Sequence, residues 1–265
     1  MGFTVFGLEI RWYGIIIAAA ILVAFFIVMQ LYKKKNYKED VVYHLVLLIV
    51  PIAIIGARIF YVVFSPVPVS LFSIRDGGLA IYGGVLAAIL VVFIYARIRK
   101  IGFFTLSDAI VIGLILAQSI GRWGNFLNQE AFGVEVGFHF FPITVRIGDA
   151  YHLATFFYES FLNLIGFVLL LQIFRKQKKF GTTTAWYFIF YGIVRAAIEP
   201  LRTDSLTIWG ASDFVLNRVS FILSLILIVV GVIILVLNHK NKINQNNANI
   251  IQKPKEEETK DAKHE

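Results

Sequence analysis

The sequence predicts an all-α polytopic membrane protein with about seven transmembrane helices and a small extracytoplasmic head. Hydrophobic residues make up 58% of its 265 residues, whereas about 45–50% of a soluble domain is apolar. Seven apolar runs approach or exceed the length that crosses a bilayer, which is roughly 20 residues. The basic residues support this interpretation, because the lysines gather in short clusters between or after the runs.

The runs divide the chain into a transmembrane domain, residues 1–240, and a tail. They lie at residues 12–31, 42–64, 79–97, 107–122, 152–174, 182–199 and 217–238. Residues 123–151 are predicted to form the extracytoplasmic head. Apolar and polar residues alternate over 131–151 with glycine and proline between them, which predicts short strands. Residues 241–265 are polar and mixed in charge, so they are predicted to form a disordered cytoplasmic tail.

The basic clusters predict the orientation of the chain in the membrane. They follow the first, third, fifth and seventh runs, at residues 33–38, 97–100, 175–179 and 240–242. Because cytoplasmic loops retain lysine and arginine, the amino terminus is expected outside and the carboxyl terminus in the cytoplasm. The formal net charge of +8 then reflects attraction to an anionic leaflet. Nucleic acid is not an expected partner.

One polar stripe lies at the end of the fourth run. Gln118, Arg122 and Asn125 are four and three residues apart, so they share one face of a helix. Asn128 and Glu130 continue the stripe. An interfacial helix end would explain one or two of these residues, since arginine extends to the surface there and asparagine caps helices. The whole set, within a short segment, favours a functional site.

A second polar stripe lies at the end of the sixth run. Tyr191, Arg195 and Glu199 are spaced by four residues, with Arg202 three residues further on. Proline lacks a backbone donor and disfavours helix in the residue before it. Pro200 is therefore expected to end or kink the helix at Glu199 and to leave Arg202 in irregular backbone. An internal ion pair between Arg195 and Glu199 is the alternative to a functional site.

These residue types indicate an anionic ligand. Charged residues inside a membrane are costly and mark functional sites, and Glu159 in the fifth run needs a partner for the same reason. Guanidinium groups bind phosphate through paired hydrogen bonds, and the phosphate available at the outer leaflet is a lipid head group. A phospholipid is therefore the favoured ligand. Carboxylates beside the arginines can orient them or accept a proton.

Other classes of function fit the sequence less well. The chain has no cysteine, which excludes disulfides, thiolate metal sites and a cysteine nucleophile, and neither a metal nor a cofactor is expected. A transporter usually has repeated halves and helices broken at the membrane midplane, and neither is found in the sequence. An intramembrane protease would need a serine–histidine pair or two facing aspartates. A purely structural membrane protein would not explain the arginines near the outer face.

Six sequence blocks together carry a family resemblance. GRWGNFLNQEAFG (121–133) looks like G-R-x-G-N-F-x-N-x-E-x-x-G, the signature of bacterial prolipoprotein diacylglyceryl transferases. The other blocks resemble that family's in the same order: RWYG (11–14), GARIFYV (56–62), DGGLAIYGG (76–84), ATFFYES (154–160) and YGIVRAAIEPLR (191–202). The resemblance implies a multi-pass enzyme of the bacterial plasma membrane, with its active site toward the outer leaflet. Such an enzyme moves the diacylglyceryl group of phosphatidylglycerol to the lipobox cysteine of a preprolipoprotein, forms a thioether and releases glycerol phosphate.

The resemblance also assigns functional residues. Carried over position by position, they are Tyr13, Arg122, Asn125, Glu130, Gly133, Glu159, Arg195 and Glu199. The expected catalytic residues are Arg122, Arg195, Glu130, Glu159 and Glu199. The residues expected to bind phosphatidylglycerol are Arg122, Asn125, Arg195, Tyr13, Tyr82, Gly133, Asn128 and Arg202. Glu199 is expected to orient Arg195, which leaves Glu130 and Glu159 as candidates to accept the thiol proton.

Two positions depart from the family pattern. Tyr82 stands where the family often has histidine, so a histidine base at this position is not universal. Tyrosine has an ordinary pKa near 10, and Tyr82 is therefore expected to donate a hydrogen bond. The family's H-P-x-x-L-Y-E block has lost its proline here, and its histidine is displaced by one residue to His152.

Overall fold

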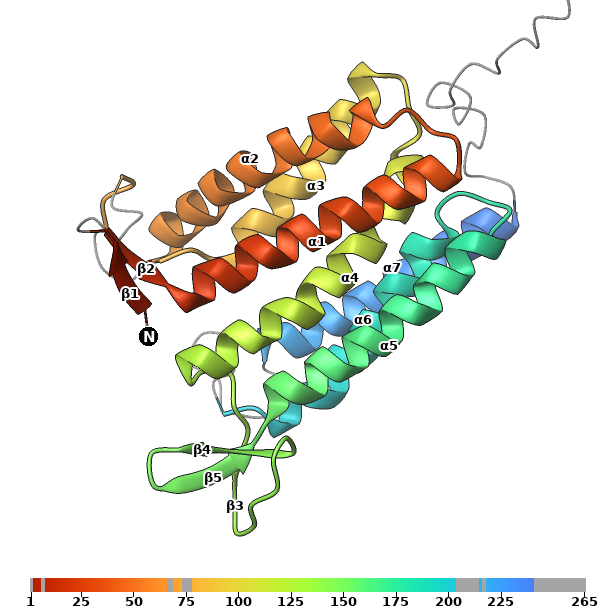
Figure 1. Ribbon diagram of the computed structural model, residues 1–265. Helices are drawn as coiled ribbons and strands as arrows, with labels where there is room; N and C mark the ends of the chain where they lie inside the picture. The colour runs from red at the N-terminus through yellow and green to blue at the C-terminus, as the bar shows by residue number, and fades with distance from the viewer. Residues whose placement is uncertain are drawn as a thin grey trace, which may run out of the picture. The chain divides into compact units, whose positions relative to one another are not determined.

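Long helices with a few short strands make up the protein (Figure 1). The structure, a computed structural model, describes residues 2–5, 8–65, 69–72, 78–203, 215 and 218–240. The elements are β1 (Gly2–Val5), β2 (Leu8–Arg11), α1 (Trp12–Lys34), α2 (Asp40–Phe64), α3 (Ile81–Ile98), α4 (Phe103–Asn128), β3 (Glu135–Val136), β4 (Thr144–Ile147), β5 (Ala150–Leu153), α5 (Thr155–Lys176), α6 (Thr182–Ile198), the 3-10 helix η2 (Glu199–Leu201) and α7 (Val219–His239). The predicted tail at 241–265 lies outside the described residues.

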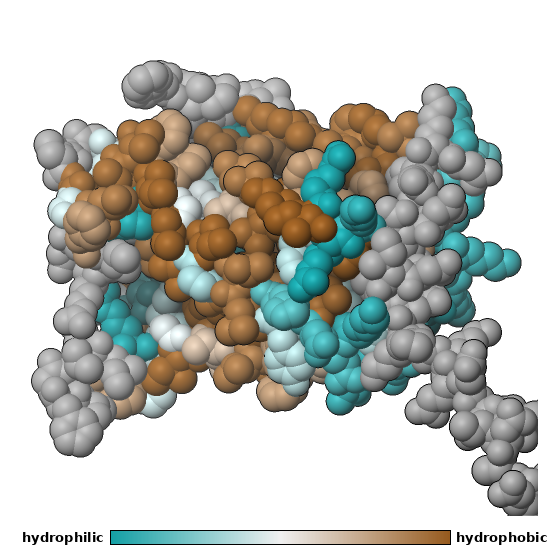
Figure 2. All heavy atoms as spheres, turned by 90° about the horizontal axis from the view of Figure 1, so that it is seen from above, coloured by the Kyte–Doolittle hydropathy of each residue, from teal (hydrophilic) through white to brown (hydrophobic). Residues whose placement is uncertain are grey.

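The helices confirm the class of an all-α polytopic membrane protein. Each of the seven apolar runs forms a helix, and α1, α2, α3, α4, α5 and α7 are long and apolar enough to cross a membrane. With 17 residues, α6 is about 25 Å long, and η2 continues it. Large apolar side chains such as Leu22, Phe26 and Val229 are exposed, and apolar residues cover much of the face in Figure 2. Acyl chains can solvate such a surface.

Two helix ends decide how the site residues are presented. Helix α4 continues to Asn128, whereas the fourth run was expected to end at residue 122, so residues 123–128 are helical and do not belong to the head loop. The left-handed backbone at Gln129 and Ala131, with φ of 53° and 57°, ends the helix there. Helix α6 ends at Ile198 and passes into η2, which confirms the break expected from Pro200.

The head contains the short strands that its alternating sequence predicts. Strands β3, β5 and β4 form a sheet in that order, and both pairs are antiparallel. The β4–β5 hairpin pairs Ile147 with Ala150 at its tip and Thr144 with Leu153 at its base. Because β5 runs almost directly into α5, the sheet fixes the start of the helix that carries Glu159.

The chain forms two compact units, Met1–Val28 with Phe103–Gln245, and Met29–Gly102 with Asn246–Glu265. In the first, α4 packs against α5 and α6, and α6 also packs against α7. Asp108 of α4 is fully buried and accepts hydrogen bonds from the backbone N–H groups of Gly181 and Thr184. The carboxylate thereby caps the first turn of α6, whose end carries site residues.

In the second unit, α2 and α3 approach each other closely through glycines. A Cβ atom added to Gly56 would lie 2.8 Å from the carbonyl oxygen of Gly83. Only glycine allows this separation, as in other closely packed membrane helices. Gly83 therefore has the packing role that glycine pairs often have, and this role explains the glycine next to Tyr82.

Candidate functional site

Glu159 is the centre of the candidate site. It lies near the start of α5, and its side chain is 1% exposed. Its Oε1 atom accepts hydrogen bonds from Arg195 Nη1 at 2.8 Å and from Arg202 Nη1 at 3.3 Å. Its Oε2 atom forms an ion pair with Arg122 Nη2. One buried carboxylate therefore holds guanidinium groups from α4, from α6 and from the residue after η2.

Arg195 links this carboxylate to a second one. Its Nη2 atom lies 2.7 Å from Glu199 Oε2, and the two paired residues are four positions apart, about one helical turn. The same atom donates a hydrogen bond to Ser220 Oγ at 3.1 Å. This ion pair joins the end of α6 to the start of η2, and it is the one that the four-residue spacing predicts. The residues Arg122, Arg195, Arg202, Glu159 and Glu199 are called the arginine cluster below.

The solvent-accessible part of the arginine cluster is its positively charged part. Glu159 and Glu199 are 1% and 0% exposed, whereas the Arg122 side chain is 20% exposed. The guanidinium groups also outnumber the carboxylates. Because guanidinium groups bind phosphate and carboxylate groups in a planar, paired geometry, the arrangement can bind an anion that approaches Arg122.

A chain of contacts leads from the arginine cluster to Glu130. Arg122 Nη1 lies 3.5 Å from Asn125 Oδ1, and Asn125 Nδ2 donates to Glu130 Oε1 at 2.9 Å. Asn128 Nδ2 lies 3.4 Å from the same oxygen. The structure thus brings together Arg122, Asn125, Asn128 and Glu130 of the signature block. Glu130 is exposed, unlike the two carboxylates of the cluster.

Tyr13 lies against the same helix. A Cβ atom on Gly124 would lie 2.8 Å from the Tyr13 ring, so the absence of a side chain at Gly124 lets the ring pack onto the backbone of α4. Gly124 lies between Arg122 and Asn125 in the sequence. The Tyr13 ring is therefore placed beside the polar stripe of α4.

Gly133 contacts the backbone of the segment that contains Arg202. The two residues form an antiparallel bridge, Gly133 N–H donates to the Leu153 carbonyl oxygen at 2.8 Å, and His152 Nδ1 lies 3.0 Å from the Gly133 carbonyl oxygen. The signature block, the end of β5 and the residues after η2 are joined at this point. This gives a structural reason for the glycine in the signature block.

Replacing Gly133 with alanine should lower the thermal stability of the protein. The added Cβ would lie 2.6 Å from the Leu201 carbonyl oxygen and 2.9 Å from Leu153 Cβ, so the backbone must move, at a cost of about 1–3 kcal/mol. The thermal unfolding midpoint in detergent measures this cost. Gly137→Ala is the matched control, since a Cβ there meets nothing within 4 Å. Equal midpoints for the two variants would contradict the close packing at Gly133.

Tyr82 is the predicted site residue of the second unit. It lies in the first turn of α3, in the other compact unit, where its ring is 6.5 Å from that of Phe60. Arg58 of the same unit is buried and donates hydrogen bonds to the carbonyl oxygens of Ser70 and Gly78. Gly78 precedes α3 closely, so Arg58 fixes the backbone that leads to Tyr82.

Sequence reasoning missed one residue that supports the arginine cluster. Arg218, directly before α7, donates from Nη1 to the backbone carbonyl oxygens of Glu199 and Arg202. Its position at the end of an apolar run was a visible signal of an unusual arginine. Its partners are backbone atoms brought near by tertiary folding, and no spacing in the sequence reveals them.

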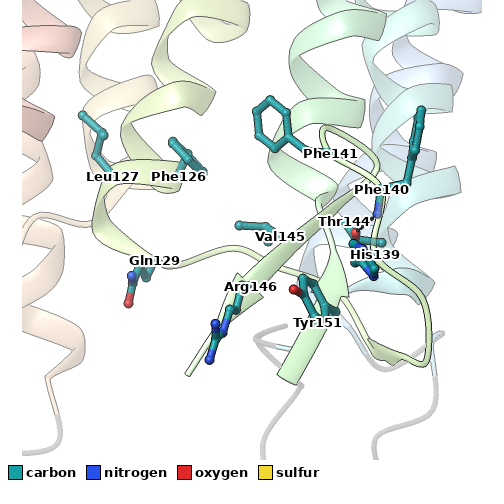
Figure 3. A pocket seen from close by; sticks show the side chains of 10 residues that line it. All are labelled: Phe126, Leu127, Gln129, His139, Phe140, Phe141, Thr144, Val145, Arg146 and Tyr151. Atoms are coloured by element: carbon teal, nitrogen blue, oxygen red, sulfur yellow. Dashed lines mark hydrogen bonds between the residues drawn. The ribbon is translucent and has the colours of Figure 1, made fainter. Parts of the chain in front are cut away.

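The head contains a separate hollow of about 510 Å³. Figure 3 shows its lining residues, which come from the end of α4, from the segment before β4 and from the β4–β5 hairpin. They are Phe126, Leu127, Gln129, His139, Phe140, Phe141, Thr144, Val145, Arg146 and Tyr151. None of these residues belongs to the arginine cluster. Within the described residues, no group of histidine, cysteine and acidic side chains could hold a metal ion.

Fold and site together define a polytopic membrane protein with an arginine–carboxylate cluster among its helices. The family model described as "Prolipoprotein diacylglyceryl transferase" matches residues 1–237. The chain belongs to this family.

Curated relatives agree with the family match, and all three described next carry the name phosphatidylglycerol–prolipoprotein diacylglyceryl transferase. The one from Listeria monocytogenes serotype 4a is 40% identical over 243 residues, which is 86% of each chain. The one from Streptococcus mutans is 41% identical over 88% of this chain and 93% of the relative. The one from Finegoldia magna is 37% identical over 92% and 96%.

Proposed function

We propose that the protein is a transferase that moves the diacylglyceryl group of phosphatidylglycerol to the cysteine thiol of a preprolipoprotein, and that the arginine cluster binds the lipid phosphate. The observation that carries the proposal is the convergence of Arg122, Arg195 and Arg202 on Glu159. The names of the relatives give the donor lipid, the acceptor protein and the transferred group. Metal and cofactor play no part in the proposed reaction.

The charges of the reaction explain why arginines are needed. The thiol sulfur attacks the glyceryl carbon that carries the phosphate, so a sulfur–carbon bond forms and a carbon–oxygen bond breaks. The electron pair of the broken bond stays with the departing glycerol phosphate. Its phosphate gains negative charge as the bond breaks, and preorganised donors stabilise charge that develops in a transition state. Arg122 and Arg195 are the proposed donors.

The carboxylates have different proposed roles. Glu159 and Glu199 orient the arginines, because both are buried and ion-paired with them. Glu130 is exposed and accepts hydrogen bonds from Asn125 and Asn128, so it is the carboxylate that an incoming thiol can reach. We assign Glu130 as the acceptor of the thiol proton, with the two amides holding it in place.

The remaining proposed roles concern lipid binding and location. Tyr13 and Gly133 border the site of phosphatidylglycerol, and Tyr82 donates a hydrogen bond to its head group. The enzyme works in the bacterial plasma membrane with its site toward the outer leaflet, because the basic clusters at 33–38, 97–100 and 175–179 would be retained in the cytoplasm. Its second substrate is the lipobox segment of a preprolipoprotein signal peptide.

The test is a transfer assay with purified protein. The protein is mixed with phosphatidylglycerol and a lipobox peptide, and mass spectrometry detects the peptide product. A thioether-linked diacylglyceryl peptide with release of glycerol phosphate is expected, and a peptide with serine in place of the cysteine should give no such product. Movement of lipid between leaflets without a peptide product would indicate a transporter and contradict the proposal.

Glu130→Gln should lower turnover by about 10²–10³-fold, within the range of general base catalysis. Glutamine still accepts hydrogen bonds from Asn125 and Asn128, so the fold should be preserved. It cannot take up a proton at neutral pH, so the dependence of turnover on pH should change. Initial rates measured across a pH series test this. A variant with the pH profile and rate of the parent would show that the thiolate forms without Glu130.

A further inference from the structure

One helical turn from the arginine cluster, toward the middle of the spans, lies a second set of polar residues. On α4, Gln118 precedes Arg122 by four residues, and on α5, Asn163 follows Glu159 by four residues. Residues four apart lie on the same helix face. Gln118 and Asn163 are called the amide layer below, and none of the roles assigned so far includes them.

Asn163 lies on α5, which packs against α4 and α6 in a helical bundle (Figure 1). It is 1% exposed. Gly166, three residues further along α5, faces the same way, since a Cβ there would lie 2.6 Å from Ile115 Cδ1 of α4 and 2.8 Å from Phe190 Cδ1 of α6. Neither the Oδ1 nor the Nδ2 atom of Asn163 has a hydrogen-bond partner.

In Gln118, one of the two amide atoms lacks a hydrogen-bond partner. Its Nε2 atom donates to the Tyr187 hydroxyl at 3.1 Å, and its buried Oε1 atom has no hydrogen-bond partner. Because the tyrosine hydroxyl can also donate, Gln118 can turn either end of its amide toward the interior. The amide layer therefore has hydrogen-bonding capacity that the protein itself does not use.

Such groups are costly, which argues against a purely structural role. A buried polar group without a partner costs about 1–3 kcal/mol, and buried polar atoms in proteins nearly always have partners. The nearby serines show the usual solution, since Ser119 Oγ donates to the Ser160 carbonyl oxygen at 2.8 Å and Ser160 Oγ donates to that of Ser119. An apolar residue at position 163 would avoid the cost.

We propose that the amide layer binds the ester carbonyl oxygens of the diacylglyceryl group. This inference rests on the proposed function. A phospholipid whose phosphate is held by the arginine cluster extends its acyl chains toward the middle of the spans, and its ester carbonyls are only a few covalent bonds from the phosphate. One turn of helix is about 5.4 Å, so Asn163 and Gln118 lie at the depth of the esters. Their NH₂ groups are donors that ester carbonyls accept.

The test compares two forms of phosphatidylglycerol with the same chain length, one with ester links and one with ether links. Ether lipids have the phosphate but lack the carbonyl oxygens. The rise in thermal unfolding midpoint of the full chain as lipid is added gives the affinity and needs no turnover. The wild-type protein should bind the ester lipid about three- to tenfold more tightly than the ether lipid, the effect of one or two ordinary hydrogen bonds. Equal affinities would overturn the proposal.

Asn163→Leu should remove this preference. Leucine has the same branched arrangement of side-chain heavy atoms and favours helix, and it replaces an amide without partners, so the unfolding midpoint without lipid should rise by a few degrees. Affinity for the ester lipid should fall to that for the ether lipid, which should not change. A variant that keeps the ester preference, or that loses affinity for both lipids equally, would overturn the proposal, and Asn163→Ala provides the same test if the leucine variant does not fold.

Two further measurements separate this proposal from its premise. Ser119→Ala, at a similar depth but with a partnered hydroxyl, is the matched control and should keep the ester preference. If the wild-type protein prefers the ester lipid and Asn163→Leu does not, but no thioether product forms with either lipid, the amide layer stands and the proposed transferase reaction fails.

Discussion

Replacing Arg122 or Arg195 with alanine is expected to lower the rate of diacylglyceryl transfer by about 10²–10³-fold, because each donor stabilises the charge that develops on the leaving phosphate. Lysine should restore little of the activity at either position. Arg195 bonds Glu159 with one nitrogen and Glu199 with the other, 2.8 and 2.7 Å away, and a single ammonium group cannot reproduce that planar fork. Initial rates at saturating lipid measure the effect.

The control for these variants is Arg146→Ala. Arg146 is an exposed arginine of the head, and its ion pair with Asp149 is solvated. Exposed pairs contribute about 0–1 kcal/mol, so this variant should keep nearly full activity and stability. Near-normal turnover in both Arg122→Ala and Arg195→Ala would contradict the assignment of the arginines as phosphate ligands.

Glu159→Gln is expected to have the largest effect on stability. The substitution removes the charge that compensates three guanidinium groups, and breaking a buried ion pair on one side costs about 3–5 kcal/mol. The glutamine oxygen can still accept a hydrogen bond, but its NH₂ group faces a guanidinium group and cannot bond it. The thermal unfolding midpoint in detergent should fall by roughly 6–20 °C, and transfer activity should be lost.

Glu130→Gln is the matched control for this charge removal. Glu130 is exposed, and its side chain accepts hydrogen bonds from the amides of Asn125 and Asn128. The unfolding midpoint of the Glu130→Gln variant should therefore stay near that of the wild-type protein. If Glu159→Gln unfolds at the same temperature as Glu130→Gln, then Glu159 does not hold the arginines together.

Much of the fold could be predicted because apolar length alone defines membrane helices. Each of the seven apolar runs forms a helix, and Pro200 ends α6 where its backbone chemistry requires. The end of α4 was misplaced, since the apolar run ends at residue 122 and residues 123–151 were assigned to the head, although the helix continues to Asn128. Hydropathy cannot mark the end of a helix whose polar face is satisfied by tertiary contacts.

The site was predictable where its residues share a helix face, and less so where they meet by folding. Helical spacing joined Arg122 to Asn125 and Arg195 to Glu199. It did not show that Glu159 receives arginines from three segments. The backbone contacts of Arg218 and the unused amide of Asn163 also depend on which helices are neighbours. Spacing within one segment carries no information on that point.

The most direct test of the central claim, that the arginine cluster binds the lipid phosphate, is ³¹P NMR of short-chain phosphatidylglycerol titrated with purified protein in detergent. The wild-type protein should cause a saturable change in the phosphate signal, because guanidinium groups would bond the phosphate oxygens directly. A variant with Arg122→Gln and Arg195→Gln together should cause little change, whereas Arg146→Ala should behave like the wild-type protein. An identical, saturable change with the double variant would contradict the account.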